Sequence, residues 1–143
     1  MGIEAGLRRG LLAVVMLGCT AGVADLLLIG HYEDPWQYTP LMLMAASLVV
    51  GSALAVAPRR GTLRLFRVLM GACVVAGLTG IRMHFSGNRE FELEVFPKMG
   101  GWELFTEAIT GATPVLAPGT MAVIGLLGLL YAWRHPGARA DRG

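Results

Sequence analysis

The chain has 143 residues, of which 55% are hydrophobic and only 15% are charged, and its formal net charge is +2. An ordinary soluble domain carries about 25% charged residues, so this composition excludes that class and favours a membrane protein. Beyond its arginines, the sequence gives no support for nucleic acid binding.

Four apolar spans follow one another along the chain, at residues 10–30, 38–57, 64–85 and 113–133. Crossing the hydrocarbon core of a bilayer takes about 20 helical residues, so each span can cross once. The third span needs Arg67 and Arg82 to extend their side chains towards water, because only the segment between them is free of charge. We therefore expect residues 1–143 to form a single membrane domain.

The charged residues sort to alternate sides of these spans. Nine of the twelve basic residues lie near the N-terminus, around the second connection or after the fourth span: Arg8, Arg9, Arg59, Arg60, Arg64, Arg67, Arg134, Arg139 and Arg142. Seven of the ten acidic residues lie in the first and third connections: Glu33, Asp34, Glu90, Glu92, Glu94, Glu103 and Glu107. Because Lys and Arg mark cytoplasmic segments, the sequence predicts an all-α bundle of four transmembrane helices. Both termini are expected in the cytoplasm, in a multi-pass protein of a bacterial inner membrane.

Small residues recur four positions apart in three of the spans. Such residues let helix backbones approach each other in lipid, where there is no hydrophobic drive for helix association. We expect them to pack the helices within one chain, with self-association as the alternative. The predicted packing residues are Gly18, Gly22, Ser47, Gly51, Ala55, Ala72, Ala76 and Gly80.

The third connection, residues 86–112, is the largest segment outside the spans. Residues 90–95 alternate acidic and apolar side chains, which predicts an extended segment with one acidic edge, ended by Pro97. Residues 101–109 predict a short amphipathic helix that lies on the membrane surface or caps the bundle. The acidic edge and the apolar face of this helix are candidates for docking a partner: Glu90, Glu92, Glu94, Trp102 and Phe105.

Asp25 interrupts the first span and continues the face of Gly22, so we expect it to point into the bundle. A carboxylate inside a membrane costs roughly 2.5–3.5 kcal/mol, so a partner or a use is expected for it. His84 continues the stripe of Gly80 in the same half of the membrane, with Arg82 turned away. The plain alternative for both residues is a structural hydrogen bond or ion pair.

Imidazole and carboxylate groups together suit a transition metal such as zinc, iron or copper. The candidate ligands on the extracytoplasmic side are His31, His84, Asp25 and Glu33. No ligand motif with fixed spacing supports this site. A haem held by two histidines is less favoured, because His31 follows the end of its predicted helix.

The sequence contains no nucleotide-binding loop and no serine nucleophile motif, which disfavours an enzyme. We therefore expect a non-catalytic accessory or structural subunit of a larger membrane complex, in contact with lipid and with other membrane subunits. One alternative is a metal- or proton-handling protein built on Asp25 and His84. Another is a minimal transporter or channel that uses Asp25.

Overall fold

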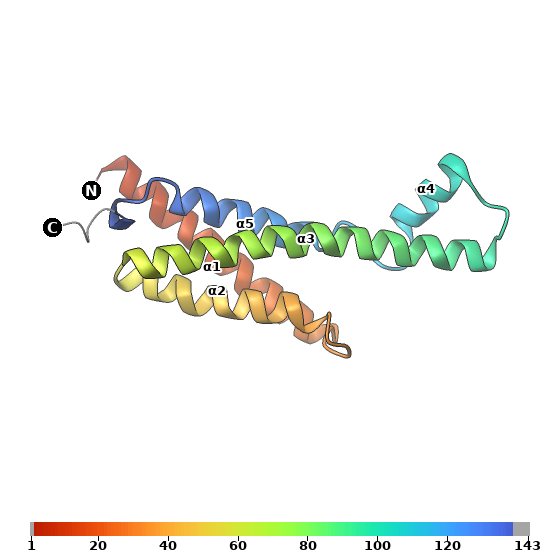
Figure 1. The fold of residues 1–143 in the computed structure, drawn as a ribbon, viewed down its shortest axis with the longest axis horizontal. Helices are drawn as coiled ribbons and strands as arrows, with labels where there is room; N and C mark the ends of the chain where they lie inside the picture. Colours follow the sequence, from red (N-terminus) through yellow and green to blue (C-terminus); the bar gives the residue numbers. More distant parts are fainter. Residues whose placement is uncertain (1, 139–143) are drawn as a thin grey trace.

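The computed structural model describes residues 2–138, which are all-helical, with no strand in that range (Figure 1). The α-helices are α1 (Ile3–Leu28), α2 (Tyr38–Val56), α3 (Arg60–Val95), α4 (Gly101–Thr110) and α5 (Gly119–Ala132), followed by a 3-10 turn at Pro136–Ala138. Arg139 and Arg142, part of the predicted basic C-terminus, lie outside the described residues.

The helices run up and down between two ends of the molecule (Figure 1). At one end α1 begins, α2 joins α3, and α5 finishes; we call this the basic end because most of the arginines lie there. At the other end α1 joins α2, and α3 joins α4. We call the part of α3 beyond Arg82, together with α4, the hairpin.

Three helices, α1, α2 and α3, are long and apolar enough to cross a membrane, with mean hydropathies of 2.2, 1.9 and 1.6 over their most apolar windows. These helices support the assignment to the membrane proteins. α5 is apolar but has only 14 residues. At about 1.5 Å per residue it rises about 21 Å, short of the roughly 30 Å of hydrocarbon. The fourth crossing therefore stays a prediction.

The prediction of an extended segment at residues 90–95 is wrong, because α3 continues as a helix to Val95. Glu and Leu are good helix formers, and the alternation of side chains did not outweigh them. The helix ends where Pro97 disfavours a helical conformation for Phe96. α3 thus has 36 residues and extends past the other long helices, and α4 folds back along it (Figure 1).

The fourth apolar helix begins later than predicted. Residue 113 was expected to start it, but α5 begins at Gly119. Residues 111–118 instead form a non-helical segment with turns, such as the bond from the Ala117 amide to the Pro114 carbonyl at 3.2 Å. We call residues 111–118 the strap, because they run along α3 before α5 starts.

The closest helix packing joins α3 to α5 through glycines. A Cβ atom built on Gly125 would lie 2.6 Å from the carbonyl oxygen of Met70, and one built on Gly77 would lie 2.6 Å from the amide nitrogen of Ala122. The two backbones can approach this closely because glycine carries only a hydrogen atom as its side chain. Met70 is fully buried in the core that these helices share with α1 and α2.

The predicted packing residues lie mostly at helix contacts. Ser47 and Gly51 are buried, whereas Gly18, Gly22, Ala72, Ala76 and Gly80 are half-buried. Ala55, the eighth residue, is exposed, and Leu54 takes the inward position instead. A strict four-residue spacing turns by about 40° per step around a helix, so Ala55 has rotated off the face that Ser47 begins.

Candidate functional site

Asn88 fastens α4 and the strap to α3. Its side chain is 5% exposed, and its amide nitrogen donates to the carbonyls of Ala108 and Thr113 at 2.9 and 2.8 Å. Its amide oxygen accepts from the Thr113 backbone N–H at 3.1 Å. One buried side chain thus fixes the end of α4 and the start of the strap. The sequence reasoning missed Asn88, because an isolated Asn gives no signal of such long-range bonds.

His84, one turn earlier on α3, holds the next part of the strap. Its Nδ1 lies 3.0 Å from the carbonyl oxygen of Pro114. A carbonyl only accepts, so Nδ1 is the donor and carries the proton. In neutral His84 the other ring nitrogen, Nε2, is then an acceptor and a possible ligand. Half-buried His84 faces the strap, whereas Arg82 is exposed.

His31 and His84 lie close together at the end of the molecule where α1 joins α2, although 53 positions separate them in the sequence. Their ring centroids are 6.5 Å apart, and the rings meet edge to face at 66°. His31 follows the end of α1, where its amide donates to the Leu26 carbonyl at 2.8 Å. The two imidazoles are therefore neighbours.

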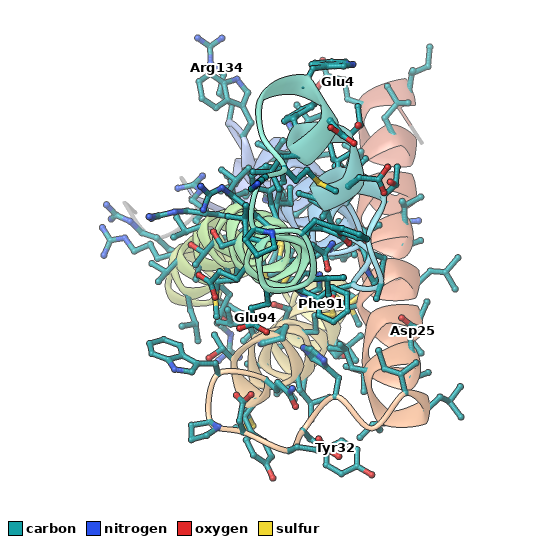
Figure 2. The ribbon with its side chains drawn as sticks, turned by 90° about the vertical axis from the view of Figure 1, so that its right-hand side faces the viewer. Glu4, Asp25, Tyr32, Phe91, Glu94 and Arg134 are labelled. Atoms are coloured by element: carbon teal, nitrogen blue, oxygen red, sulfur yellow. The ribbon has the colours of Figure 1, made fainter. Side chains whose placement is uncertain are left out.

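Asp25 and Glu33, the other two candidate ligands, are both exposed. The expectation that Asp25 points into the bundle is wrong. The buried stripe of α1 follows Val15 and Cys19, and Leu26 is half-buried on the same side. Asp25 lies about 100° from Leu26 around the helix, on α1 at the edge of the molecule (Figure 2). Within the described part of the chain, no three His, Cys, Asp or Glu side chains are grouped so as to hold a metal ion.

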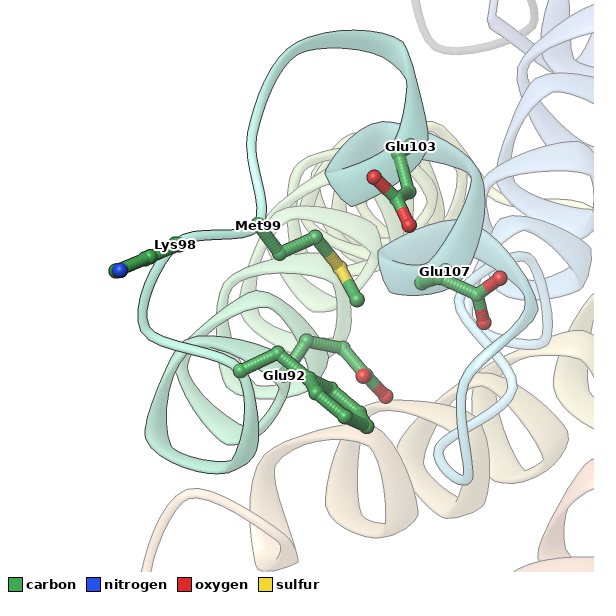
Figure 3. A pocket seen from close by; sticks show the side chains of 6 residues that line it. Glu92, Lys98, Met99, Glu103 and Glu107 are labelled. Carbon is green, nitrogen blue, oxygen red and sulfur yellow. The ribbon is translucent and has the colours of Figure 1, made fainter.

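The three glutamates of the predicted acidic edge do not lie on one side of α3. Glu90 and Glu94 are one turn apart on the exposed side of α3, whereas Glu92 is half-buried and turned towards α4. There Glu92 lines a groove of about 560 Å³ with Phe96, Lys98, Met99, Glu103 and Glu107. Figure 3 shows the Lys98 amine pointing outward, away from the three carboxylates.

α4 packs on α3 through Phe105, which belongs to the predicted apolar face, and through Ala108 beside it. Ala108 is fully buried, and the Phe105 ring lies 5.8 Å from that of Phe85. Trp102 stacks on Phe105 at 5.1 Å but remains 76% exposed. The hairpin therefore keeps the Trp102 side chain uncovered, and Phe91 on α3 is also exposed, at 58% (Figure 2).

At the basic end, two arginines bind the C-terminus of α5. Arg8 Nη1 donates to the carbonyls of Tyr131 and Trp133, both at 2.9 Å, and Arg67 Nη2 donates to that of Ala132 at 2.7 Å. The last carbonyls of a helix have no partner within the helix, so these bonds satisfy them and offset the negative end of the helix dipole. The sequence indicated only that both arginines belong to the basic, cytoplasmic side of the spans.

His135 lies beside this arrangement and was also missed. It is 8% exposed, and its ring centroid lies 5.1 Å from that of Tyr131. Its Nδ1 accepts from the Gly137 amide at 3.1 Å. Burial, and then the positive charges of Arg8 and Arg67, lower the pKa of His135 below its ordinary value.

No family model, curated protein or solved structure matches this chain.

Proposed function

We propose that this protein is a non-catalytic accessory subunit of a larger membrane complex, and that the hairpin is the part that docks on its partner. The observation that carries this proposal is the projection of the hairpin past the other long helices (Figure 1). The part of α3 from Arg82 to Val95 is about 20 Å long, at 1.5 Å per residue. Asn88 holds α4 against this projecting part.

The surface of the hairpin suits a protein partner. Phe91, Phe96 and Trp102 are 58%, 54% and 76% exposed. Exposed aromatic side chains beside charged ones are typical of protein interaction sites. Residues 86–112 carry five acidic and two basic side chains, so a partner with basic groups around an apolar centre would be complementary.

In this proposal the chain crosses the membrane four times, with the basic end in the cytoplasm. The strap and α5 together form the fourth crossing. Non-helical backbone is tolerated at membrane depth only where other groups satisfy it. The bonds from His84 to the Pro114 carbonyl and from Asn88 to Thr113 supply such partners at the start of the strap.

The orientation can be tested with a membrane-impermeant maleimide on intact cells. Both native cysteines, Cys19 and Cys73, are buried, so background labelling should be low. Lys98→Cys on the hairpin should be labelled in intact cells, and Arg59→Cys only after the membrane is opened. The reverse pattern, or labelling of both in intact cells, would contradict the proposed orientation.

The exposed position of Asp25 also favours a subunit role. A carboxylate on the outside of a membrane helix costs energy unless it reaches water or a polar partner. A neighbouring subunit could cover this side of α1. Since Asp25 does not face the interior of the bundle, the structure gives no support to a transport path that uses it.

Site-specific photo-crosslinking tests the docking role directly. A photoreactive residue at Trp102 should join the chain to another polypeptide in its native membrane. The matched control is Val123, which is 56% exposed on α5 and reports contact with lipid. Crosslinking of position 102 to lipid alone would overturn the docking role of the hairpin.

A second candidate function rests on the histidine pair. Because Nδ1 of His84 is committed to Pro114, its Nε2 and the imidazole of His31 are free to share a proton or a metal ion. The test is retention of zinc or copper by the purified protein, compared with His31→Gln. Equal metal content in the two proteins would remove this candidate.

A further inference from the structure

A groove at the basic end has the features of a lipid site. It lies between α3 and the end of α5, has a volume of about 580 Å³, and is lined by Arg67, Leu129, Trp133 and Arg134. This volume falls within the range of about 300–1,000 Å³ that is typical of small-molecule sites. The walls are mainly apolar, and both polar lining residues are arginines.

We propose that this groove binds one anionic phospholipid of the cytoplasmic leaflet. The acyl chain would lie along Leu129 and Trp133, and the phosphate would be bound between the guanidinium groups of Arg67 and Arg134. This inference rests on the proposed membrane placement of the chain. It does not depend on the docking role of the hairpin.

The charges around the groove favour an anion. A helix C-terminus normally repels anions, because its free carbonyls carry partial negative charge. Here Arg8 and Arg67 donate to the carbonyls of Tyr131 and Ala132 on α5 and of Trp133 just after it. The bond from Arg67 to Ala132 uses one of the five N–H donors of its guanidinium, which leaves donors for a phosphate oxygen.

Arg134 is held at the mouth of the groove by its own backbone and by Trp133. Its φ of 46° is in the left-handed region, which an L residue rarely adopts. Its guanidinium carbon lies 5.9 Å from the centre of the Trp133 ring, at a distance typical of a cation–π contact. Trp is enriched at the membrane interface, the depth at which lipid phosphates lie.

The apolar walls distinguish a lipid from a soluble anion. A free phosphate would gain nothing from Leu129 or from the exposed ring of Trp133, whereas an acyl chain would cover both. Basic pockets between transmembrane helices on the cytoplasmic side are known to suit anionic headgroups. The groove therefore fits a ligand that joins a phosphate to a hydrocarbon chain.

Native mass spectrometry of the full chain in detergent tests this, with phosphatidylglycerol and phosphatidylcholine of equal acyl length as probes. The protein should bind phosphatidylglycerol more tightly. Each arginine near a membrane surface contributes about 1 kcal/mol, so Arg134→Gln should weaken this binding about fivefold. The control Arg59→Gln removes a charge at the same end but outside the groove, and should leave binding unchanged.

Three results would overturn the lipid site. They are equal binding of the two lipids, an equal loss of lipid binding in the Arg59 and Arg134 variants, and displacement of the lipid by millimolar inorganic phosphate alone.

Arg67→Gln is unsuitable as a variant because it also removes the hydrogen bond to the C-terminus of α5. Filling the groove with Leu129→Trp serves as a second variant, and should reduce lipid binding while the unfolding temperature without added lipid confirms a folded protein. Failure of these tests leaves the crosslinking at Trp102 unaffected.

Discussion

Replacement of Asn88 by alanine should release α4 and the strap from α3. The variant loses three hydrogen bonds, to Ala108 and to both backbone groups of Thr113. Each such bond contributes roughly 0.5–1.5 kcal/mol net, and the groups left behind are partly buried, so the total loss should be about 2–4 kcal/mol. We expect α4 to detach locally while the core helices stay folded.

Hydrogen–deuterium exchange of the full chain in detergent measures this release. A loss of 2–4 kcal/mol corresponds to exchange in α4 that is roughly 30 to 1,000 times faster, since every 1.4 kcal/mol is about tenfold. The control is Thr110→Ala, which removes an exposed hydroxyl that bonds only within α4, at 2.8 Å to Thr106. Its exchange should match that of the unchanged protein.

Asn88→Asp sharpens the test, because it keeps the shape of the side chain. The carboxylate can still accept from the Thr113 amide but can no longer donate to the two carbonyls, and it places negative charge against their oxygens. This variant should be at least as damaging as Asn88→Ala. If α4 in both Asn88 variants exchanges at the same rate as in Thr110→Ala, the assigned role of Asn88 is wrong.

Three further predictions concern other contacts. Gly125→Ala brings a methyl group within 2.6 Å of a backbone carbonyl and should cost about 1–3 kcal/mol in thermal unfolding, whereas Gly71→Ala, with open space around it, should not; equal losses would contradict the packing. The lowered pKa of His135 means that the fold favours its neutral form, so stability should be constant above about pH 6.5 and decrease below it. Denaturant titrations should show no such decrease in His135→Gln. His84→Phe should cost about 1 kcal/mol, and His84→Asn, which keeps a donor, should recover part of it.

Local sequence signals predicted much of the helical architecture. The apolar span at 38–57 and the amphipathic pattern at 101–109 predicted the ends of α2 and α4 to within one residue, because those ends depend on nearby groups. The alternation at residues 90–95 was misleading, since a period of two does not exclude a helix when most of the residues are Glu and Leu, which are good helix formers. Pro97, not the pattern before it, ends α3.

Tertiary contacts account for the features that the sequence could not predict. The late start of α5 depends on Asn88 and His84, which bind the strap from another helix. The outward direction of Asp25 depends on which side of α1 is covered by α2 and α5. The small-residue stripe suggested one side, and the buried stripe of Val15 and Cys19 turned out to be centred on another.

Native mass spectrometry of the chain extracted from its own membrane in mild detergent tests the subunit role most directly. We expect the extracted chain to be bound to one or more different polypeptides. Changing the exposed hairpin residues Phe91 and Trp102 to Ser should release it from them. A chain found only alone or with copies of itself, whatever metal it carries, would show that it is not a subunit of a larger complex.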